Sequence, residues 1–185
     1  MKLLLKICLA LVVVLVIGVV GFSFILPRQI MVTKSVSIDA KPEKVFPYLN
    51  NPADWKRWSA WNKTYDPSLI YMYGGPLSGK GARQGWSGDK TGNWQMVFTN
   101  ATAPDSLTYD LKETGTTIVA KGVITLQQTG DSTLVTWHQS MPLEDNMLAL
   151  YEGLWKQHRT EQEVQQGLEN LKTLISDTKH NTAKK

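Results

Sequence analysis

The side chains in this sequence that could move protons or bind anions are few and scattered along the chain. The candidates are His138, His158, Asp89, Asp110, Glu113, Glu144, Glu152 and Arg83. General acid–base catalysis needs a titratable group that is held beside the substrate and perturbed by its surroundings. The alternation of apolar residues puts His138 and Asp110 on solvent-facing sides of their strands, and it puts Arg83 out of phase with Trp86. No spacing typical of a metal site, a nucleophile elbow or a phosphate-binding loop occurs, so we expect no catalytic residues, no metal ligands and no cofactor.

Aromatic side chains are the second group of candidate functional residues. The chain has 7 tryptophans in 185 residues, and each offers a large apolar surface with one N–H donor. Binding sites for apolar molecules are mostly hydrophobic with a few fixed polar groups. The candidate ligand-binding residues are Trp58, Trp61, Tyr71, Tyr73, Trp86, Trp94, Tyr109 and Trp137. The alternative interpretation is that these rings only fill the interior.

The elements that would position these rings are short strands separated by turns. Alternating apolar and polar residues predict seven strands, over residues 32–39, 69–73, 82–88, 93–100, 106–112, 116–127 and 133–140. The connections DKTG, NATAPD, ETG and TGD supply the glycine, proline, Asp or Asn that turn the chain, and short turns favour antiparallel neighbours. Each strand has one apolar side, as with Trp94, Met96 and Phe98. One face of the sheet is therefore expected to be solvated, and the other face to pack against another element of the domain.

A C-terminal helix is expected to cover the apolar face. The apolar residues that recur at helical spacing are Val164, Leu168, Leu171 and Ile175. Thr160 and Glu163 have the spacing of a capping box, which predicts that the helix begins there. Before it, residues 147–155 predict a separate helical turn or two. Residues 178–185 have no apolar anchor, so we expect a disordered tail.

The opening of the domain has an unusual order of elements. Ser35 to Trp61 reads SVSIDAKPEKVFPYLNNPADWKRWSAW, which predicts a strand, a short helix containing Pro47, a break, and an aromatic-rich second helical piece. This pattern resembles the START-like (SRPBCC) superfamily, specifically its bacterial polyketide cyclase/dehydrase-type members. The residues that carry the resemblance are Ala40, Pro42, Glu43, Val45, Phe46, Asn51, Pro52, Trp55 and Trp58, and the later stretches Gly79 to Met96, Ser132 to Trp137 and Gly167 to Ile175 agree with it. The resemblance covers about Val32 to Ser176.

The resemblance implies an α+β helix-grip fold over residues 32–177. In such a fold a seven-stranded, curved antiparallel sheet wraps around one long C-terminal helix. A strongly bent sheet cannot contact a straight helix along its full width, so space remains between the two. The resemblance therefore implies a cavity that the eight aromatic candidates at least partly line.

Residues 7–26 form an apolar run without a charge, ICLALVVVLVIGVVGFSFIL. At about 1.5 Å per residue the run is long enough to cross a hydrocarbon core of roughly 30 Å. A cleaved signal peptide is the alternative, but its apolar region is usually about 7–15 residues long, and no small-x-small cleavage site follows here. We expect residues 1–28 to form a single-pass membrane anchor. Counts of Lys and Arg do not decide its orientation, but a short leader with Lys2 and Lys6 normally stays in the cytoplasm, which favours an extracytoplasmic domain in a bacterial envelope.

Charge and cysteine content exclude some other classes. The net charge is +4 with scattered Lys and Arg, which argues against a nucleic-acid partner, and the one cysteine, Cys8, permits no internal disulfide. We interpret the chain as a membrane-anchored domain that binds a hydrophobic small molecule or lipid. The alternatives are a cyclase- or dehydratase-like enzyme on an apolar substrate and a non-catalytic structural or interaction module. A cavity too small for a ligand would favour the module, and a buried carboxylate or imidazole paired with a second polar group would favour the enzyme.

Overall fold

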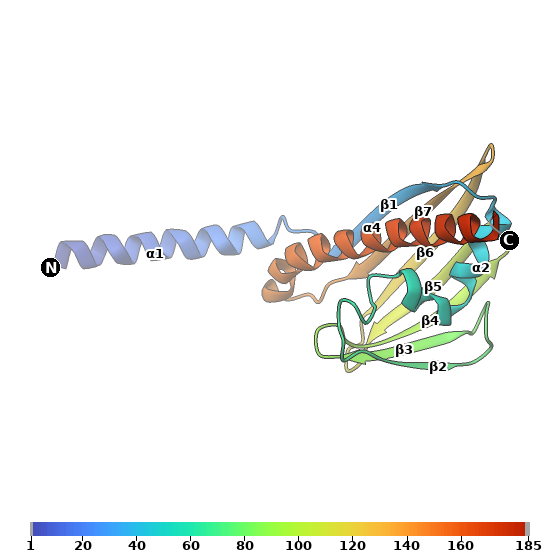
Figure 1. The fold of residues 1–185 in the computed structure, drawn as a ribbon. Helices are drawn as coiled ribbons and strands as arrows, with labels where there is room; N and C mark the ends of the chain where they lie inside the picture. Colours follow the sequence, from blue (N-terminus) through green and yellow to red (C-terminus); the bar gives the residue numbers. More distant parts are fainter. Residues whose placement is uncertain (1, 184–185) are drawn as a thin grey trace.

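Helix α1 (Lys2–Ser23) projects away from the rest of the molecule, as Figure 1 shows. The computed structural model describes residues 2–183, and the side chains of residues 4–179. Within α1, Leu4–Ser23 has a mean hydropathy of 2.9 and no buried residue, and it is long enough to cross a membrane. Five residues, 24–28, then lead into the first strand.

The seven predicted strands are all present and form one antiparallel sheet. They are β1 (Gln29–Ile38), β2 (Ile70–Gly74), β3 (Arg83–Gly88), β4 (Gly92–Thr102), β5 (Ser106–Glu113), β6 (Val119–Thr129) and β7 (Ser132–Pro142). Their order across the sheet is β1-β7-β6-β5-β4-β3-β2, so the first two strands of the chain form the two edges. The β4–β5 ladder shifts register between Phe98 and Asn100, and bulges of this kind bend a sheet.

One face of this curved sheet is apolar and the other is polar, as the alternation predicts. On β5, Leu107, Tyr109 and Leu111 are at most 3% exposed, while the residues between them are only partly buried. Edge strands β1 and β2 are joined by a compact segment that contains α2 (Pro42–Asn50), a 3₁₀ turn η1 (Pro52–Asp54) and α3 (Trp55–Trp58).

Two tryptophans of the W-x-x-W pattern fix α3 to α2. The indole N–H of Trp55 donates to the carbonyl of Leu49 at 2.8 Å, and that of Trp58 donates to the carbonyl of Tyr48 at 3.0 Å. Pro47 lies inside α2 and shortens its hydrogen-bond ladder, which is consistent with a helix of only 9 residues. The indoles therefore supply donors to carbonyls at the end of a helix, where intrahelical partners are missing.

The C-terminal helix α4 (Met147–Ala183) is one element of 37 residues, not the two pieces that the sequence predicts. The side-chain oxygen of Asn146 accepts from the backbone N–H of Ala149 at 2.8 Å, so the helix is capped at Asn146. The predicted capping box is wrong, because the Thr160 hydroxyl donates to the Lys156 carbonyl inside the helix. Residues 178–183, expected to belong to a disordered tail, continue the helix, and residues 184–185 lie outside the described residues.

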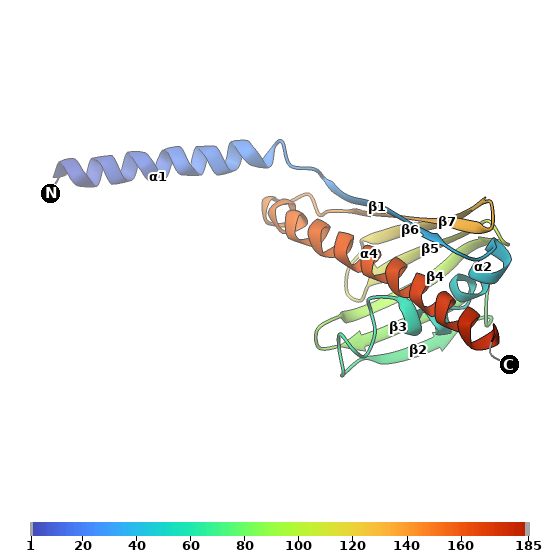
Figure 2. The same ribbon diagram turned by 45° about the horizontal axis from the view of Figure 1, so that its top comes forward.

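Helix α4 crosses the concave side of the sheet, as Figure 2 shows. The α+β helix-grip fold is thus confirmed. The N-terminal end of α4 lies at the same end of the domain as α1, and its C-terminal end lies at the opposite end. Along its second half the helix buries four apolar residues completely or nearly so. These residues are Val164, Leu168, Leu171 and Ile175.

Candidate functional site

A cavity of about 500 Å³ lies between the sheet and the first half of α4. Its apolar wall includes Trp61, Trp86, Trp94, Leu111, Met141 and Leu143. Its polar and charged lining includes Asp89, Lys90, Glu113, Glu144, Glu152, Lys156, Arg159 and Glu163. A hollow of about 760 Å³ also runs along the solvent side of α4, but polar and charged surface side chains line most of it. We take the smaller cavity as the candidate site because it has both an apolar wall and fixed polar groups.

Three tryptophans form the aromatic wall of this cavity. The rings of Trp61 and Trp86 stack with their centroids 5.1 Å apart and their planes 20° apart. Trp94 is the cross-strand partner of Trp86, and its indole N–H donates to the carbonyl of Thr91 at 2.8 Å. The wall is therefore held by ring contacts and by a hydrogen bond to the β3–β4 turn.

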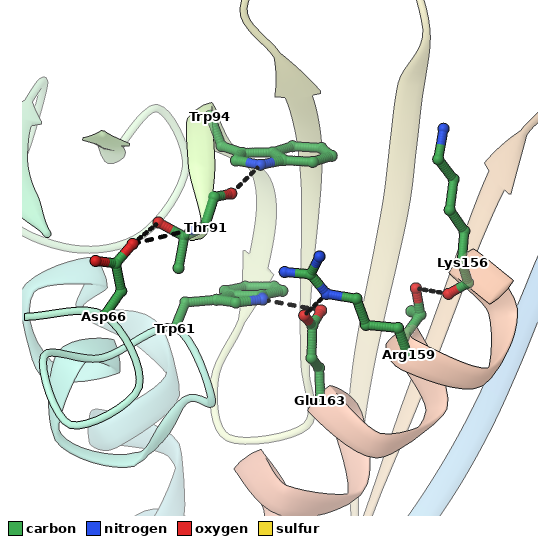
Figure 3. A network of polar contacts seen from close by, with 8 residues as sticks. Trp61, Asp66, Thr91, Trp94, Lys156, Arg159 and Glu163 are labelled. Atoms are coloured by element: carbon green, nitrogen blue, oxygen red, sulfur yellow. Dashed lines mark hydrogen bonds and ion pairs between the residues drawn. The ribbon is translucent and has the colours of Figure 1, made fainter. Parts of the chain in front are cut away.

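Asp66 ties that turn to the connection between α3 and β2 (Figure 3). One carboxylate oxygen accepts from the backbone N–H groups of Lys90 and Thr91 at 2.8 and 3.0 Å, and the other accepts from the Ser68 hydroxyl at 2.5 Å. The Ser68 hydrogen bond, followed by those from Thr91 and Lys90, outweighs desolvation and holds the pKa of Asp66 well below its usual range. Asp66 is 1% exposed and fully hydrogen-bonded, so its role is to position the turn that holds Trp94.

Glu163 connects the aromatic wall to α4 (Figure 3). Its carboxylate accepts from the Trp61 indole N–H at 3.1 Å and from the Arg159 Nε–H at 2.8 Å. Partial burial opposes the charge on Arg159, but the hydrogen bond and the negative charge of Glu163 outweigh it and raise the pKa of Arg159. About two turns earlier on the helix, Lys156 pairs with Glu152 at 3.5 Å. Two ion pairs therefore line the α4 side of the cavity.

A buried polar relay reaches the cavity from the sheet. The Trp137 indole N–H donates to the Tyr109 hydroxyl at 2.8 Å, and this hydroxyl donates to Gln139 Oε1 at 2.9 Å. Gln139 lines the cavity and is 5% exposed. Complete burial raises the pKa of Tyr109, so this phenol keeps its proton.

The eight aromatic candidates fall into three groups. Trp61, Trp86 and Trp94 line the cavity. Trp58, Tyr109 and Trp137 are at most 1% exposed and belong to the packed core behind it. On the edge strand β2, Tyr71 donates to the carbonyl of Trp61 at 2.9 Å, and Tyr73 is half exposed and stacks on Tyr71.

The titratable candidates also lie in different parts of the molecule. Asp89, Glu113, Glu144 and Glu152 line the cavity. His138 lies on the opposite face of the sheet, where its Nδ1 is 2.7 Å from the Thr33 hydroxyl, and Asp110 shares that face of the sheet. His158 contributes to the hollow on the solvent side of α4, and Arg83 is exposed. Among the residues whose side chains are described, no three His, Cys, Asp or Glu side chains are grouped to hold a metal ion.

Gln139, Asp66 and Glu163 are among the polar residues of the site that the sequence does not single out as candidates. Gln139 is in phase with the buried Val135 and Trp137, and a polar residue in an apolar phase is a signal of a buried hydrogen bond. Asp66 precedes a proline in a turn-rich connection, and nothing in that segment predicts its partners on β3–β4. The sequence pattern predicts that Glu163 belongs to a helix cap. Because α4 is continuous, Glu163 instead lies one turn from Arg159 on the same helix.

Comparisons with known proteins agree with this architecture. Residues 29–176 match the family model described as polyketide cyclase / dehydrase and lipid transport. Protein MLL2253 from Mesorhizobium loti is similar in structure with a TM-score of 0.61 and 18% identity, over 80% of this chain and 98% of that one. A protein from Arthrobacter aurescens gives a TM-score of 0.59 and 16% identity, over 80% and 87%.

A third similar structure comes from a protein of a biosynthetic locus. DynU16, described as a putative protein in the dynemicin biosynthetic locus, gives a TM-score of 0.55 and 14% identity, over 79% of this chain and 47% of that one. These identities support a shared fold. The comparison with curated proteins gives no match.

Proposed function

The chain belongs to the polyketide cyclase / dehydrase and lipid transport family, and from this membership we propose that it binds one hydrophobic small molecule or lipid in the cavity beneath the first half of α4. The observation that carries the proposal is the cavity itself. Its volume of about 500 Å³ lies within the roughly 300–1,000 Å³ typical of small-molecule sites. A module filled by its own side chains would leave no such space, so the volume argues against the structural alternative.

The aromatic wall supports an apolar ligand in particular. Trp61, Trp86 and Trp94 present ring surface to the cavity, while most charged groups that line it are on α4 or in connecting segments. An apolar body would lie against the rings and leave its polar end near the charged groups. A fully polar ligand would lose its hydration against the rings without gaining partners there.

We also propose that α1 anchors this domain to the cell membrane, with the domain on the extracytoplasmic side. The first half of α4, which lines the cavity, lies at the α1 end of the domain (Figure 1). Tyr151 of α4 donates to the carbonyl of Val19 at 2.6 Å, and its ring lies 6.3 Å from that of Phe22. Leu148 and Trp155 share that face of α4 and are 71% and 81% exposed. Aromatic and apolar side chains beside a spanning helix suit the membrane interface.

The binding proposal is tested with the full chain in lipid nanodiscs and the uncharged fluorophore N-phenyl-1-naphthylamine. Energy transfer from tryptophan to the fluorophore is measured against fluorophore concentration, with empty nanodiscs and an unrelated single-pass protein as references. We expect one saturable component that decanoic acid displaces. Transfer that rises without saturation, as in the references, would contradict the proposal.

The anchor has a separate test. A reporter that is active only after translocation, fused after Lys185, should be active, and the membrane-extracted protein should retain the sequence of α1. A reporter that is active only in the cytoplasm would contradict the orientation. A mature protein that begins after Gly21 would contradict the anchor.

One observation favours the cyclase-like alternative. Glu163 lines the cavity, its side chain is 20% exposed, and it is paired with Trp61 and Arg159. Such a carboxylate could remove a proton from a carbon between two carbonyl groups. The test is hydrogen–deuterium exchange at that carbon of a 1,3-diketone, followed by NMR. Exchange that the wild type accelerates and Glu163→Gln does not, with equal binding of the diketone, would favour the enzyme; no acceleration by the wild type would remove this alternative.

A further inference from the structure

We propose that the side-chain amide of Gln139 donates a hydrogen bond to the bound molecule, which therefore carries an acceptor oxygen, such as a carbonyl, on the part of its apolar body that enters the cavity. This inference rests on the proposed function and adds the ligand's polar group to it. It assigns Gln139 as a specificity-determining residue.

The strand register brings the parts of this site together. Tyr109 on β5 pairs with Gly122 on β6, and Gly122 pairs with Gln139 on β7. A Cβ at position 122 would lie 2.0 Å from the ring Cζ of Tyr109. The Tyr109 ring therefore occupies the space that the Cβ atom of any other residue at position 122 would need. Glycine inside a strand often marks such a close approach. Tyr109 can therefore reach across β6 to the Gln139 side chain.

The direction of the hydrogen bonds follows from the first donor. An indole N–H can only donate, so the oxygen of Tyr109 accepts from Trp137, and the one phenolic proton is free to go to Gln139. Gln139 Oε1 accepts that proton. With the amide turned the other way, the phenolic proton would face an NH₂ group and lose its acceptor. The relay therefore fixes which end of the amide is the oxygen.

The Nε2 end of Gln139 is consequently a donor in the cavity lining. Gln139 is 5% exposed, and within the described residues no protein group accepts from its Nε2. Its neighbours in the lining on the sheet side include Met141 and Leu111, which have no oxygen in their side chains. A ligand that covered this donor without supplying an acceptor would leave it unpaired, so a ligand that supplies an acceptor gains affinity there.

A second unpaired donor belongs to a residue of the lining, but its nitrogen is not exposed to the cavity. Trp86 also lines the cavity, and its indole Nε1 is buried without a partner among the described residues. Trp61 and Trp94, by contrast, use their indole N–H groups on Glu163 and Thr91. The unpaired groups of the two lining residues Gln139 and Trp86 are thus both donors, which favours a ligand group that can accept a hydrogen bond, such as a carbonyl, over one that can only donate, such as an ammonium.

The test uses a pair of probes with the same shape, 2-acetylnaphthalene and 2-isopropenylnaphthalene. They differ by a carbonyl oxygen in place of a CH₂ group. Dissociation constants are measured by tryptophan quenching on the full chain in nanodiscs, and the ratio of the two is compared between proteins at one lipid concentration. Partition into lipid then cancels, because it is the same for every protein.

We expect Gln139→Met to lower the preference for the ketone by about fivefold to tenfold, the worth of one buried hydrogen bond. Met141→Leu is the matched control, since residue 141 lines the same cavity from the same strand and offers no donor. It should change both constants alike and leave the ratio unaltered. An unchanged ratio in Gln139→Met, or an equal fall in Met141→Leu, would overturn the inference while leaving the binding function intact.

A measurement on the unaltered protein keeps the inference testable if Gln139→Met does not fold. In ¹⁵N-labelled protein the side-chain amide protons of Gln139 should move downfield with the ketone and not with the alkene. Equal shifts with the two probes would overturn the inference. If neither probe binds saturably, both the inference and the proposed function fail.

Discussion

Between residues 164 and 175, helix α4 buries apolar side chains on the sheet, whereas between residues 149 and 163 the same helix presents charged side chains to a cavity. The packed half is filled by an aromatic cluster in which Trp55 lies 4.6 Å from Trp58 and 5.7 Å from Trp137 between ring centroids. The cavity half has Trp61, Trp86 and Trp94 at its wall. Tryptophan therefore has two uses within one concave surface.

The difference between the halves follows from what each helix segment offers the sheet. Val164, Leu168 and Leu171 are fully buried in the same core cluster as the rings. Gly167 lets the helix approach, because a Cβ there would lie 3.0 Å from the Trp137 ring. In the cavity half Glu163 and Arg159 satisfy each other's charge. Removing charged side chains from water costs free energy, which opposes closing this half of the helix onto the rings. The packed half supplies stability and leaves the other half free for a ligand.

The largest expected contrast is between two tryptophans. Trp137→Ala should lower the free energy of unfolding by about 3–5 kcal/mol, because it removes a fully buried ring and the donor to Tyr109. Trp94→Ala should cost less stability and weaken fluorophore binding about tenfold, because its ring lines the cavity. Denaturant unfolding and binding titrations check both, with Lys112→Ala as the surface control. Equal stability losses for the two tryptophans would contradict the division into packed and open halves.

A smaller contrast is expected among aliphatic residues. Leu168→Ala or Leu171→Ala should cost about 2–5 kcal/mol, since both side chains are fully buried. Met141→Ala should cost about 1 kcal/mol or less, because its side chain is only partly buried and borders the cavity. Urea unfolding measures the loss of the free energy of unfolding in each variant. Losses below about 0.5 kcal/mol at both leucines would mean that α4 does not pack there.

The most modest effect is expected from Asp66, which holds the edge of the cavity half. Because its pKa is lowered in the folded state, its ionised form stabilises the fold above about pH 4, and this contribution is lost as the pH falls toward the lowered pKa. Asp66→Asn should therefore lower the Tm at pH 7, and the gap from wild type should narrow below about pH 4. Calorimetry across this range checks it. A gap that stays constant with pH would show that the carboxylate charge is not involved.

The sequence predicts the strands and their buried faces because apolar and polar residues alternate along each strand, and the apolar ones all face the same core. It fails at the start of α4 because residues 147–163 face a cavity, so the apolar periodicity that marks a buried helix is missing there. Gln139 and Asp66 were missed for another reason. Their hydrogen-bond partners, Tyr109 and Thr91, come from other strands or turns and are defined only by the register of the sheet. Three of eight aromatic candidates line the cavity, since alternation assigns a face but not a position along the groove.

The segment between α1 and β1 limits how far the domain can move from α1. Residues 24–28, fully extended, span about 17 Å, and the chain is shortened further because Leu26 is buried and the Arg28 carbonyl accepts from the Leu143 N–H at 2.9 Å. Arg28 also pairs with Asp145, just before α4. With α1 in a bilayer, the domain would stay within a fixed short reach of the lipid surface. Its encounters would then be confined to the plane of one membrane, so it would suit the capture of molecules from that leaflet and would be unable to carry them across a wide aqueous gap.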